Sequence, residues 1–280
     1  MDQITIKSLI PKFLSFYDKA KDIKDDETRF QLWKKHYNFA ALPPVKDYDS
    51  RAKKLLDNAW LNYKDIIEDL MVWEEDLNHV QTLLKKVKTA LQYDEALKLT
   101  VVYFVGAFEN NAFVAQLSED ETGLFLPVET KALDIILAHE LTHIVHFNKS
   151  GLAATWERTI ASVILQEGLA MHISKRVVPG YQDEKYTEFT KGWLKACAQH
   201  RAAMLSGIMP YLEDQSEARL KQFTIGKGTT NHEREAYFVG WVCVEYLLND
   251  GLTFEILASL KVNEIPPLIK ATITKILTKK

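Results

Sequence analysis

Two histidines and a glutamate stand close together in the middle of the chain, in a pattern that could bind a metal ion. His139 and His143 are four positions apart, and Glu140 follows the first of them. On an α-helix, residues with this spacing lie on one face, so both imidazoles can reach a single Zn²⁺ at about 2.0–2.1 Å. Glu140 is rotated by about 100° from His139. It can therefore approach a water on the metal instead of the metal, as a general base does.

The segment that carries these residues has the periodicity of a helix. Within residues 131–147, apolar residues recur at positions 133, 136, 137, 141, 144, 145 and 147, which is the spacing of one helical face. His146 continues the histidine face three positions after His143, where a third histidine ligand would be awkward on a straight helix. We interpret His146 as a packed residue or as one that supports a ligand.

A catalytic zinc ion needs a third protein ligand and one position left open for water. Residues 155–175 read as a second helix, and they contain two glutamates that could supply this ligand. Glu157 stands in a charged context that is typical of an exposed first turn. Glu167 is followed by Gly168, whose missing side chain would let another helix or a substrate backbone come close. We therefore favour Glu167 as the third ligand.

The two motifs together resemble the gluzincin metallopeptidases, and most of all the YjaZ-type zinc-dependent proteases. The motifs are AHELTHIVH at residues 138–146 and QEGLAMHIS at residues 166–174. A weaker Tyr-x-x-Gly pattern follows at Tyr237 and Gly240. The resemblance covers roughly residues 97–250.

This resemblance implies a zinc-dependent peptidase with a zincin-like catalytic domain. His139, His143 and Glu167 would hold Zn²⁺, and Glu140 would be the general base that acts on the attacking water. The expected partner is a peptide or oligopeptide substrate.

Two residues are candidates for stabilising the oxyanion of the tetrahedral intermediate. Thr230 and Glu233 form a plausible capping box, which predicts a helix that runs to Asn249. Tyr237 would lie one turn into this helix and His232 in its first turn. Either side chain could donate a hydrogen bond to the oxyanion, although each could equally be an ordinary packed or exposed residue.

Three details depart from the gluzincin pattern or extend it. Met171 stands where many gluzincins carry an acidic residue that orients a zinc-bound histidine, so we consider Asp134, near His139, for that role. Glu109 lies in GAFEN, which resembles the GAMEN motif of aminopeptidases that bind a substrate's amino group, but the residues after it differ. We prefer the strand at residues 123–128 as an edge that pairs with an extended substrate.

The elements that must position these residues follow a simple order along the chain. Residues 1–95 read as a helical region, and residues 96–280 as the catalytic domain. Strands are expected at residues 97–108, 111–117 and 123–129, and helices after them. The predicted fold is therefore α+β and mostly helical, with a small mixed sheet.

Composition narrows the possible partners and the compartment. The 280 residues include 35 Lys and Arg against 38 Asp and Glu, a net charge of −3. This balance favours neither a nucleic acid nor an anionic membrane as a partner. No apolar run is long enough to cross a bilayer, and the start lacks the features of a signal peptide, so we expect a cytoplasmic protein. The two cysteines read as buried free thiols, and no oligomeric state is predicted.

Two alternatives to a peptidase stay open on the sequence alone. The first is a catalytically inactive zinc-binding scaffold, whose partner groove would be the apolar stripe of residues 56–91. The second is an all-helical interaction protein that binds no metal. The first alternative predicts bound zinc without hydrolysis, and the second predicts no bound zinc.

Overall fold

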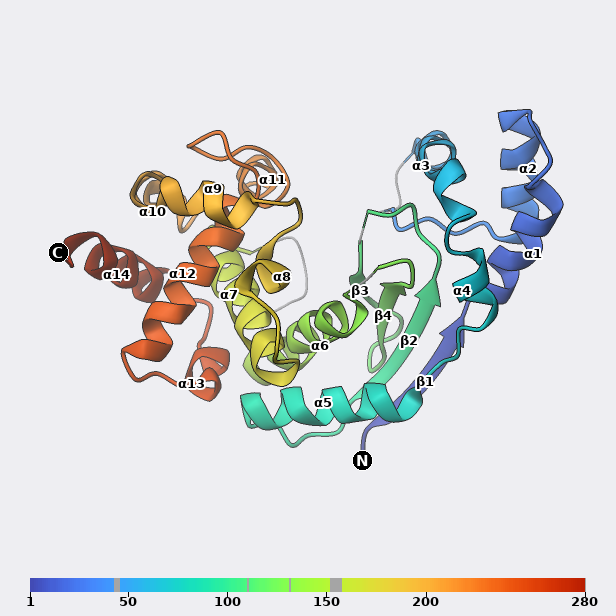
Figure 1. Ribbon diagram of the computed structural model, residues 1–280. Helices are drawn as coiled ribbons and strands as arrows, with labels where there is room; N and C mark the ends of the chain where they lie inside the picture. The colour runs from blue at the N-terminus through green and yellow to red at the C-terminus, as the bar shows by residue number, and fades with distance from the viewer. Residues whose placement is uncertain (43–45, 110, 131, 152–157, 280) are drawn as a thin grey trace. The chain divides into compact units, whose positions relative to one another are not determined.

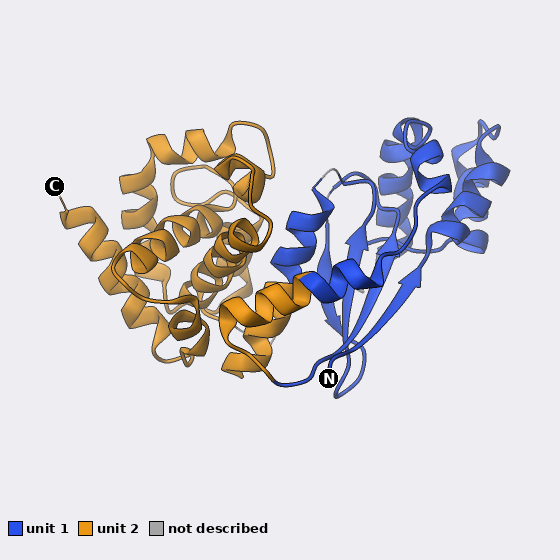
Figure 2. Cartoon of the chain, turned by 60° about the horizontal axis from the view of Figure 1, so that its bottom comes forward, with its two compact units in different colours: residues 1–82, 95–140 blue, residues 83–94, 141–280 orange. Residues whose placement is uncertain are grey.

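A computed structural model describes residues 1–42, 46–109, 111–130, 132–151 and 158–279 (Figure 1). It shows a mostly helical α+β protein with one small mixed sheet, which confirms the expected fold class. The chain divides into two compact units (Figure 2). The first contains residues 1–82 and 95–140, and the second contains residues 83–94 and 141–280. The units therefore do not follow the division expected at residue 95.

The sheet of the first unit has four strands in the order β1-β2-β4-β3. They are β1 (Gln3–Ser8), β2 (Lys98–Phe104), β3 (Phe113–Gln116) and β4 (Thr122–Pro127). β1 and β4 both pair in parallel with β2, whereas β3 pairs antiparallel with β4. Every residue of β2 after Lys98 is buried, as its central place and its β-branched and aromatic residues require.

The structure corrects the helical expectation for residues 1–95 at its first segment. β1 alternates between exposed residues and half-buried ones such as Ile4 and Ile6, which is the period-two pattern of an edge strand. Ile4 pairs with Leu99 and Ile6 with Val101. These partners lie more than 90 residues away, so the short β1 segment could not be recognised from local pattern alone.

The expectation that residues 123–128 form a sheet edge is wrong. β4 lies between β2 and β3, and the outer strand is β3. Phe113 of β3 pairs with Phe125 of β4, and their rings stack with centroids 4.5 Å apart. The backbone of β4 is thus covered on both sides, and β3 is the edge that could pair with another chain.

The helices of the first unit precede the second strand or follow the last one. They are α1 (Ile10–Ala20), α2 (Asp26–His36), α3 (Tyr48–Tyr63), α4 (Ile67–Met71), the first part of α5 (Leu77–Leu91) and the first part of α6 (Leu133–Ser150). Phe13 and Phe16 of α1 are fully buried. The apolar stripe of residues 56–91 is divided among α3, α4 and α5 and is mostly buried, so it does not form an open groove.

The second unit is built around two central helices, α7 (Ile160–Val177) and α12 (Glu235–Asn249). Every residue of α7 from Ile160 to Ser174 is buried, as expected for a central helix with apolar residues on most of its circumference. Around this pair lie α8 (Asp183–Thr187), α9 (Trp193–Gln199), α10 (Arg201–Ile208), η1 (Met209–Tyr211), α11 (Glu217–Thr224), α13 (Phe254–Ser259) and α14 (Ile265–Thr278). Within the described ranges, no helix has the length and apolar character that crossing a membrane requires.

The end of β2 gives a test of the fold of the first unit. The buried Tyr37 hydroxyl donates to the carbonyl of Val105 and accepts from its N–H, both at 2.8 Å. Tyr37→Phe would leave both backbone groups without this partner, so we expect it to lower the free energy of unfolding by about 1–3 kcal/mol. Urea denaturation measures this change. Tyr181→Phe, at an exposed tyrosine, is the control and should change stability by less than about 0.5 kcal/mol.

Candidate metal centre

Three side chains from two helices meet in a cluster that could hold a metal ion. His139 and His143 come from α6, and Glu167 comes from α7. One ligand atom from each lies within 4.8 Å of the others. In the described part of the chain, this is the one group of three or more such residues close enough to share an ion. These are the three residues that the sequence motifs predict as ligands.

The spacing within the cluster suits a small divalent cation. Nε2 of His143 lies 3.5 Å from Oε2 of Glu167, and their side chains are 10% and 5% exposed. Two ligand atoms on a tetrahedral zinc ion would lie about 3.4 Å apart, given metal–ligand distances of about 2.0–2.2 Å. His139 is half-buried, so the cluster is less enclosed at this residue. Two imidazoles and one carboxylate are also a donor set that catalytic zinc sites use.

Glu140, the expected general base, stands next to a cluster residue in the sequence. It follows His139 in α6 and is half-buried. It does not belong to the three-residue cluster. Because consecutive helical residues are rotated by about 100°, Glu140 does not share the helix face of His139 and His143.

His146 is packed in the interior, as the sequence interpretation allows. Its side chain is fully buried, and neither ring nitrogen has a hydrogen-bond partner in the part of the chain that the structure describes. Burial, with a smaller effect from His143, lowers the pKa of His146 to about 3. His146 is therefore neutral at ordinary pH and lies outside the cluster.

Asp134 does not support a cluster histidine, which corrects the sequence hypothesis. Its Oδ1 lies 2.9 Å from Nε2 of His79 in α5, and the side chains of His79 and Asp134 are 40% and 57% exposed. His79 is distant in sequence and carries no motif, so this competing partner could not be foreseen. The other candidate ligand, Glu157, lies outside the described residues.

The helix expected to begin at Thr230 begins later, at Glu235. The fully buried Glu235 carboxylate accepts hydrogen bonds from the backbone N–H groups and hydroxyls of Thr229 and Thr230. These bonds hold residues 229–234 as a loop, in which Asn231 has a positive φ of 64°. The predicted capping box is therefore wrong, because Thr230 bonds to Glu235 and not to Glu233.

The two candidates for oxyanion stabilisation lie on this loop and on the helix after it. Tyr237 is the third residue of α12 and is half-buried, with the Arg234 guanidinium 5.3 Å from its ring centre. His232 lies in the loop, not in a first helical turn. Its Nδ1 is 3.0 Å from both the hydroxyl and the carbonyl oxygen of Thr230, and its ring lies 4.8 Å from that of His200. Neither candidate belongs to the three-residue cluster.

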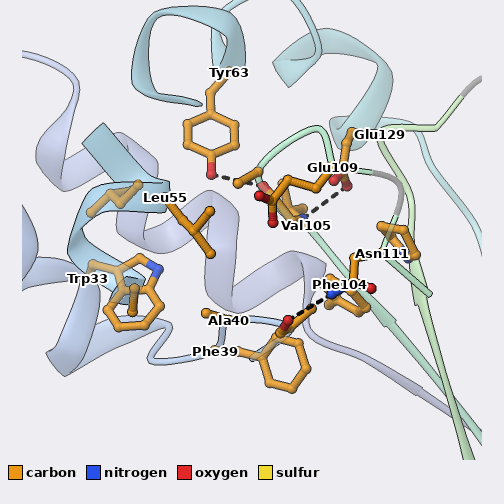
Figure 3. Close-up of a pocket in the computed structure, with 16 residues that line it drawn as sticks. Trp33, Phe39, Ala40, Leu55, Tyr63, Phe104, Val105, Glu109, Asn111 and Glu129 are labelled. Carbon is orange, nitrogen blue, oxygen red and sulfur yellow. Dashed lines mark hydrogen bonds between the residues drawn. The ribbon is translucent and has the colours of Figure 1, made fainter. Parts of the chain in front are cut away.

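Glu109 lies in a separate pocket of the first unit, beyond the ends of β2 and β4 (Figure 3). The walls of this pocket include Trp33, Phe39 and Tyr63, and none of the cluster residues is among the described residues that line it. Burial raises the pKa of Glu109 and also that of Glu129 beside it.

Glu129 has a structural task in this pocket that the sequence did not reveal. Its carboxylate accepts hydrogen bonds from the N–H groups of Gly106 (2.9 Å) and Phe108 (3.2 Å). Phe108 has a positive φ of 64°, a strained conformation for a bulky residue. Glu129 thus holds the turn at residues 106–109 in place. Local sequence could not predict this contact, because the turn and Glu129 follow different strands that come together only in the folded sheet.

His172 of α7 ties that helix to α12. Its ring stacks on Trp241 with centroids 3.9 Å apart, and its Nε2 lies 2.9 Å from the Trp241 carbonyl oxygen. Burial lowers the pKa of His172 to about 4. The folded protein therefore keeps this imidazole neutral in a pH range where the unfolded chain already binds a proton.

This difference predicts acid sensitivity that depends on His172. Because its folded pKa is depressed, its contribution is complete above about pH 6.5 and is lost as the pH falls towards 4. Between pH 7.5 and 4.5, we expect wild type to lose about 2 kcal/mol more unfolding free energy than His172→Phe. Urea denaturation at both values measures this. His200→Gln, at an exposed histidine, should behave as wild type, and equal losses in wild type and His172→Phe would contradict the prediction.

Comparison with known proteins does not identify the chain. No model of a known protein family matches the chain, and no curated protein matches it. The relation to gluzincins therefore stays an expectation from the two motifs. The structure itself shows a mostly helical α+β chain in which His139, His143 and Glu167 are placed to hold a metal ion.

Proposed function

We propose that the protein is a zinc-dependent peptidase of the gluzincin type, similar to the YjaZ-type proteases, with a zincin-like catalytic fold. One observation carries the proposal. His139 and His143 of α6 have ligand atoms within 4.8 Å of those of the buried Glu167 of α7, and Glu140 stays outside this set. His143 and Glu167 come as close as 3.5 Å. A helix with two metal-binding histidines and a free glutamate is the arrangement that zinc-dependent hydrolysis of peptide bonds requires.

His139, His143 and Glu167 would hold the zinc ion and leave a fourth position open. When bound there, zinc polarises the scissile carbonyl group and lowers the pKa of a coordinated water towards about 7. Glu140 accepts a proton from the attacking water and then delivers it to the leaving amine. The buried carboxylate of Glu167 and the imidazole of His143 keep their positions because both are enclosed by packed helices.

The oxyanion that develops during the attack needs a hydrogen-bond donor. Tyr237 is the favoured candidate, because its helix packs against the helix that carries Glu167. Gly240, three residues after Tyr237, packs directly on Gly168, the neighbour of Glu167. His232 remains the alternative. Its Nδ1 is engaged with Thr230, so Nε2 is the nitrogen that would face a substrate.

The substrate class that fits best is a peptide in an extended conformation. β3 is an edge strand, so its outer backbone groups can pair with an added strand. β3 therefore replaces residues 123–128 as the proposed pairing edge. Glu109 is the residue to test for recognition of a free amino group, because its carboxylate lies in a partly buried pocket.

The rival functions differ in what they predict. A zinc-binding scaffold would hold the metal and hydrolyse no peptide. The scaffold's proposed groove at residues 56–91 is mostly buried. The all-helical interaction protein conflicts with the four-stranded sheet.

The first test concerns the general base. We expect Glu140→Gln to lower turnover of a quenched peptide library by at least about a hundredfold, because an amide cannot accept the proton. Bound zinc, measured by elemental analysis, should stay near one per chain. Glu245→Gln, at an exposed position of α12, is the matched control and should keep wild-type turnover. Full activity in Glu140→Gln would overturn the mechanism.

The second test concerns the metal itself. His143→Ala removes one of three ligands, so we expect the Kd for Zn²⁺ to rise by at least about a hundredfold. Competition with a chromophoric chelator measures this Kd. His200→Ala, at a histidine outside the cluster, should bind zinc as wild type does. Tight zinc binding by wild type without hydrolysis of any peptide would favour the scaffold.

A further inference from the structure

Glycines occupy the interior of both central helices of the second unit. Gly168 lies in α7, Gly240 lies in α12, and both are buried. Glycine disfavours a helix interior more than any residue except proline. Neither glycine has a positive φ, so conformational freedom does not explain them. Packing between the helices does.

The two backbones touch at these glycines. A Cβ added at Gly168 would collide with the carbonyl oxygen of Gly240 and would lie 2.6 Å from Cγ2 of Val244. A Cβ added at Gly240 would collide with the carbonyl oxygen of Ile164 and would lie 3.0 Å from the Gly168 nitrogen. Most of the obstructing atoms belong to the backbone, which cannot turn aside as a side chain can. Any side chain at either position must therefore push the helices apart.

A second contact fixes how α7 and α12 are rotated. The rings of His172 and Trp241 are nearly parallel, with an interplanar angle of 7°, and His172 also bonds to the Trp241 carbonyl oxygen. His172 lies four residues after Gly168, one turn along α7 on the same face. The glycine crossing and this stack together prevent α7 from sliding or turning against α12.

We infer that Gly240 is a positioning residue for Glu167. Glu167 directly precedes Gly168, so the depth at which α7 lies against α12 sets the position of its carboxylate beside His143. This role rests on the proposed metal site. It means that the Tyr-x-x-Gly segment helps to place a metal ligand. Gly240 acts only through α7 and contacts neither the metal nor the substrate.

The distances involved show why a single methyl group matters. Non-bonded carbon and oxygen atoms need roughly 3.5 Å, so Gly240→Ala must displace the α7 backbone by about 1 Å. Metal–ligand distances tolerate only about 0.2 Å. The Glu167 side chain is almost completely enclosed, which limits its freedom to compensate for a shift of its helix.

The experiment measures Co²⁺ binding to metal-depleted full-length protein, because the visible spectrum of bound Co²⁺ reports ligand geometry. We expect Gly240→Ala to raise the Kd for Co²⁺ by about tenfold or more and to change the spectrum, while Val239→Ala stays within about twofold of wild type. Val239 is a fully buried neighbour on α12, so this control loosens the same helix without pushing on α7.

A milder variant covers the case in which Gly240→Ala does not fold. His172→Phe keeps an aromatic ring against Trp241 but loses the hydrogen bond, and we expect a Kd about threefold higher. An unchanged Kd and spectrum in folded Gly240→Ala would overturn the role of Gly240, and so would an unchanged Kd in His172→Phe if Gly240→Ala is unfolded. If wild type binds no Co²⁺, the proposed metal site is wrong and this role is overturned with it.

Discussion

The second unit depends on one constraint: it must hold a carboxylate in the middle of a helix that is buried on every side. Burying an ionised carboxylate is costly unless charged or hydrogen-bonding groups surround it. Glu167 meets this requirement at His143, 3.5 Å away. Packed helices hold such a carboxylate in place more firmly than flexible surface loops would. The helices that pack around α7 supply that enclosure.

The two central helices also show how an apolar core can direct polar chemistry. Apart from Glu167, much of what α7 buries is aliphatic, and it packs on an α12 that is similarly apolar. Close backbone approach at Gly168 and Gly240 gives this pair a fixed separation. Glu167 directly precedes Gly168, and Tyr237 lies three residues before Gly240. The packing of α7 against α12 therefore helps to position the helices that carry both residues.

Local pattern was sufficient for the elements with strong periodicity. The strand at residues 98–104 follows from its β-branched and aromatic residues, and the helix with His139 and His143 follows from the spacing of its apolar residues. The cluster with Glu167 was predictable because both motifs lie on neighbouring helices. Contacts between distant segments could not be predicted in this way. β1 depends on pairing with Leu99 and Val101, and the start of α12 depends on the bonds from Glu235 to a preceding loop. Such contacts between distant segments have no local signature. The partner of Asp134 could not be predicted for the same reason.

The burial of α7 has a consequence for how the protein is made. α7 is complete at Val177, but α12, against which it packs, begins only at Glu235. During synthesis, which proceeds from the N-terminus at about 5–20 residues per second, the apolar surface of α7 leaves the ribosome several seconds before its cover exists. Over that interval, the nascent chain presents an unprotected helix that carries one carboxylate. The same all-round burial that encloses Glu167 in the finished protein thus makes the growing chain a natural client for chaperones.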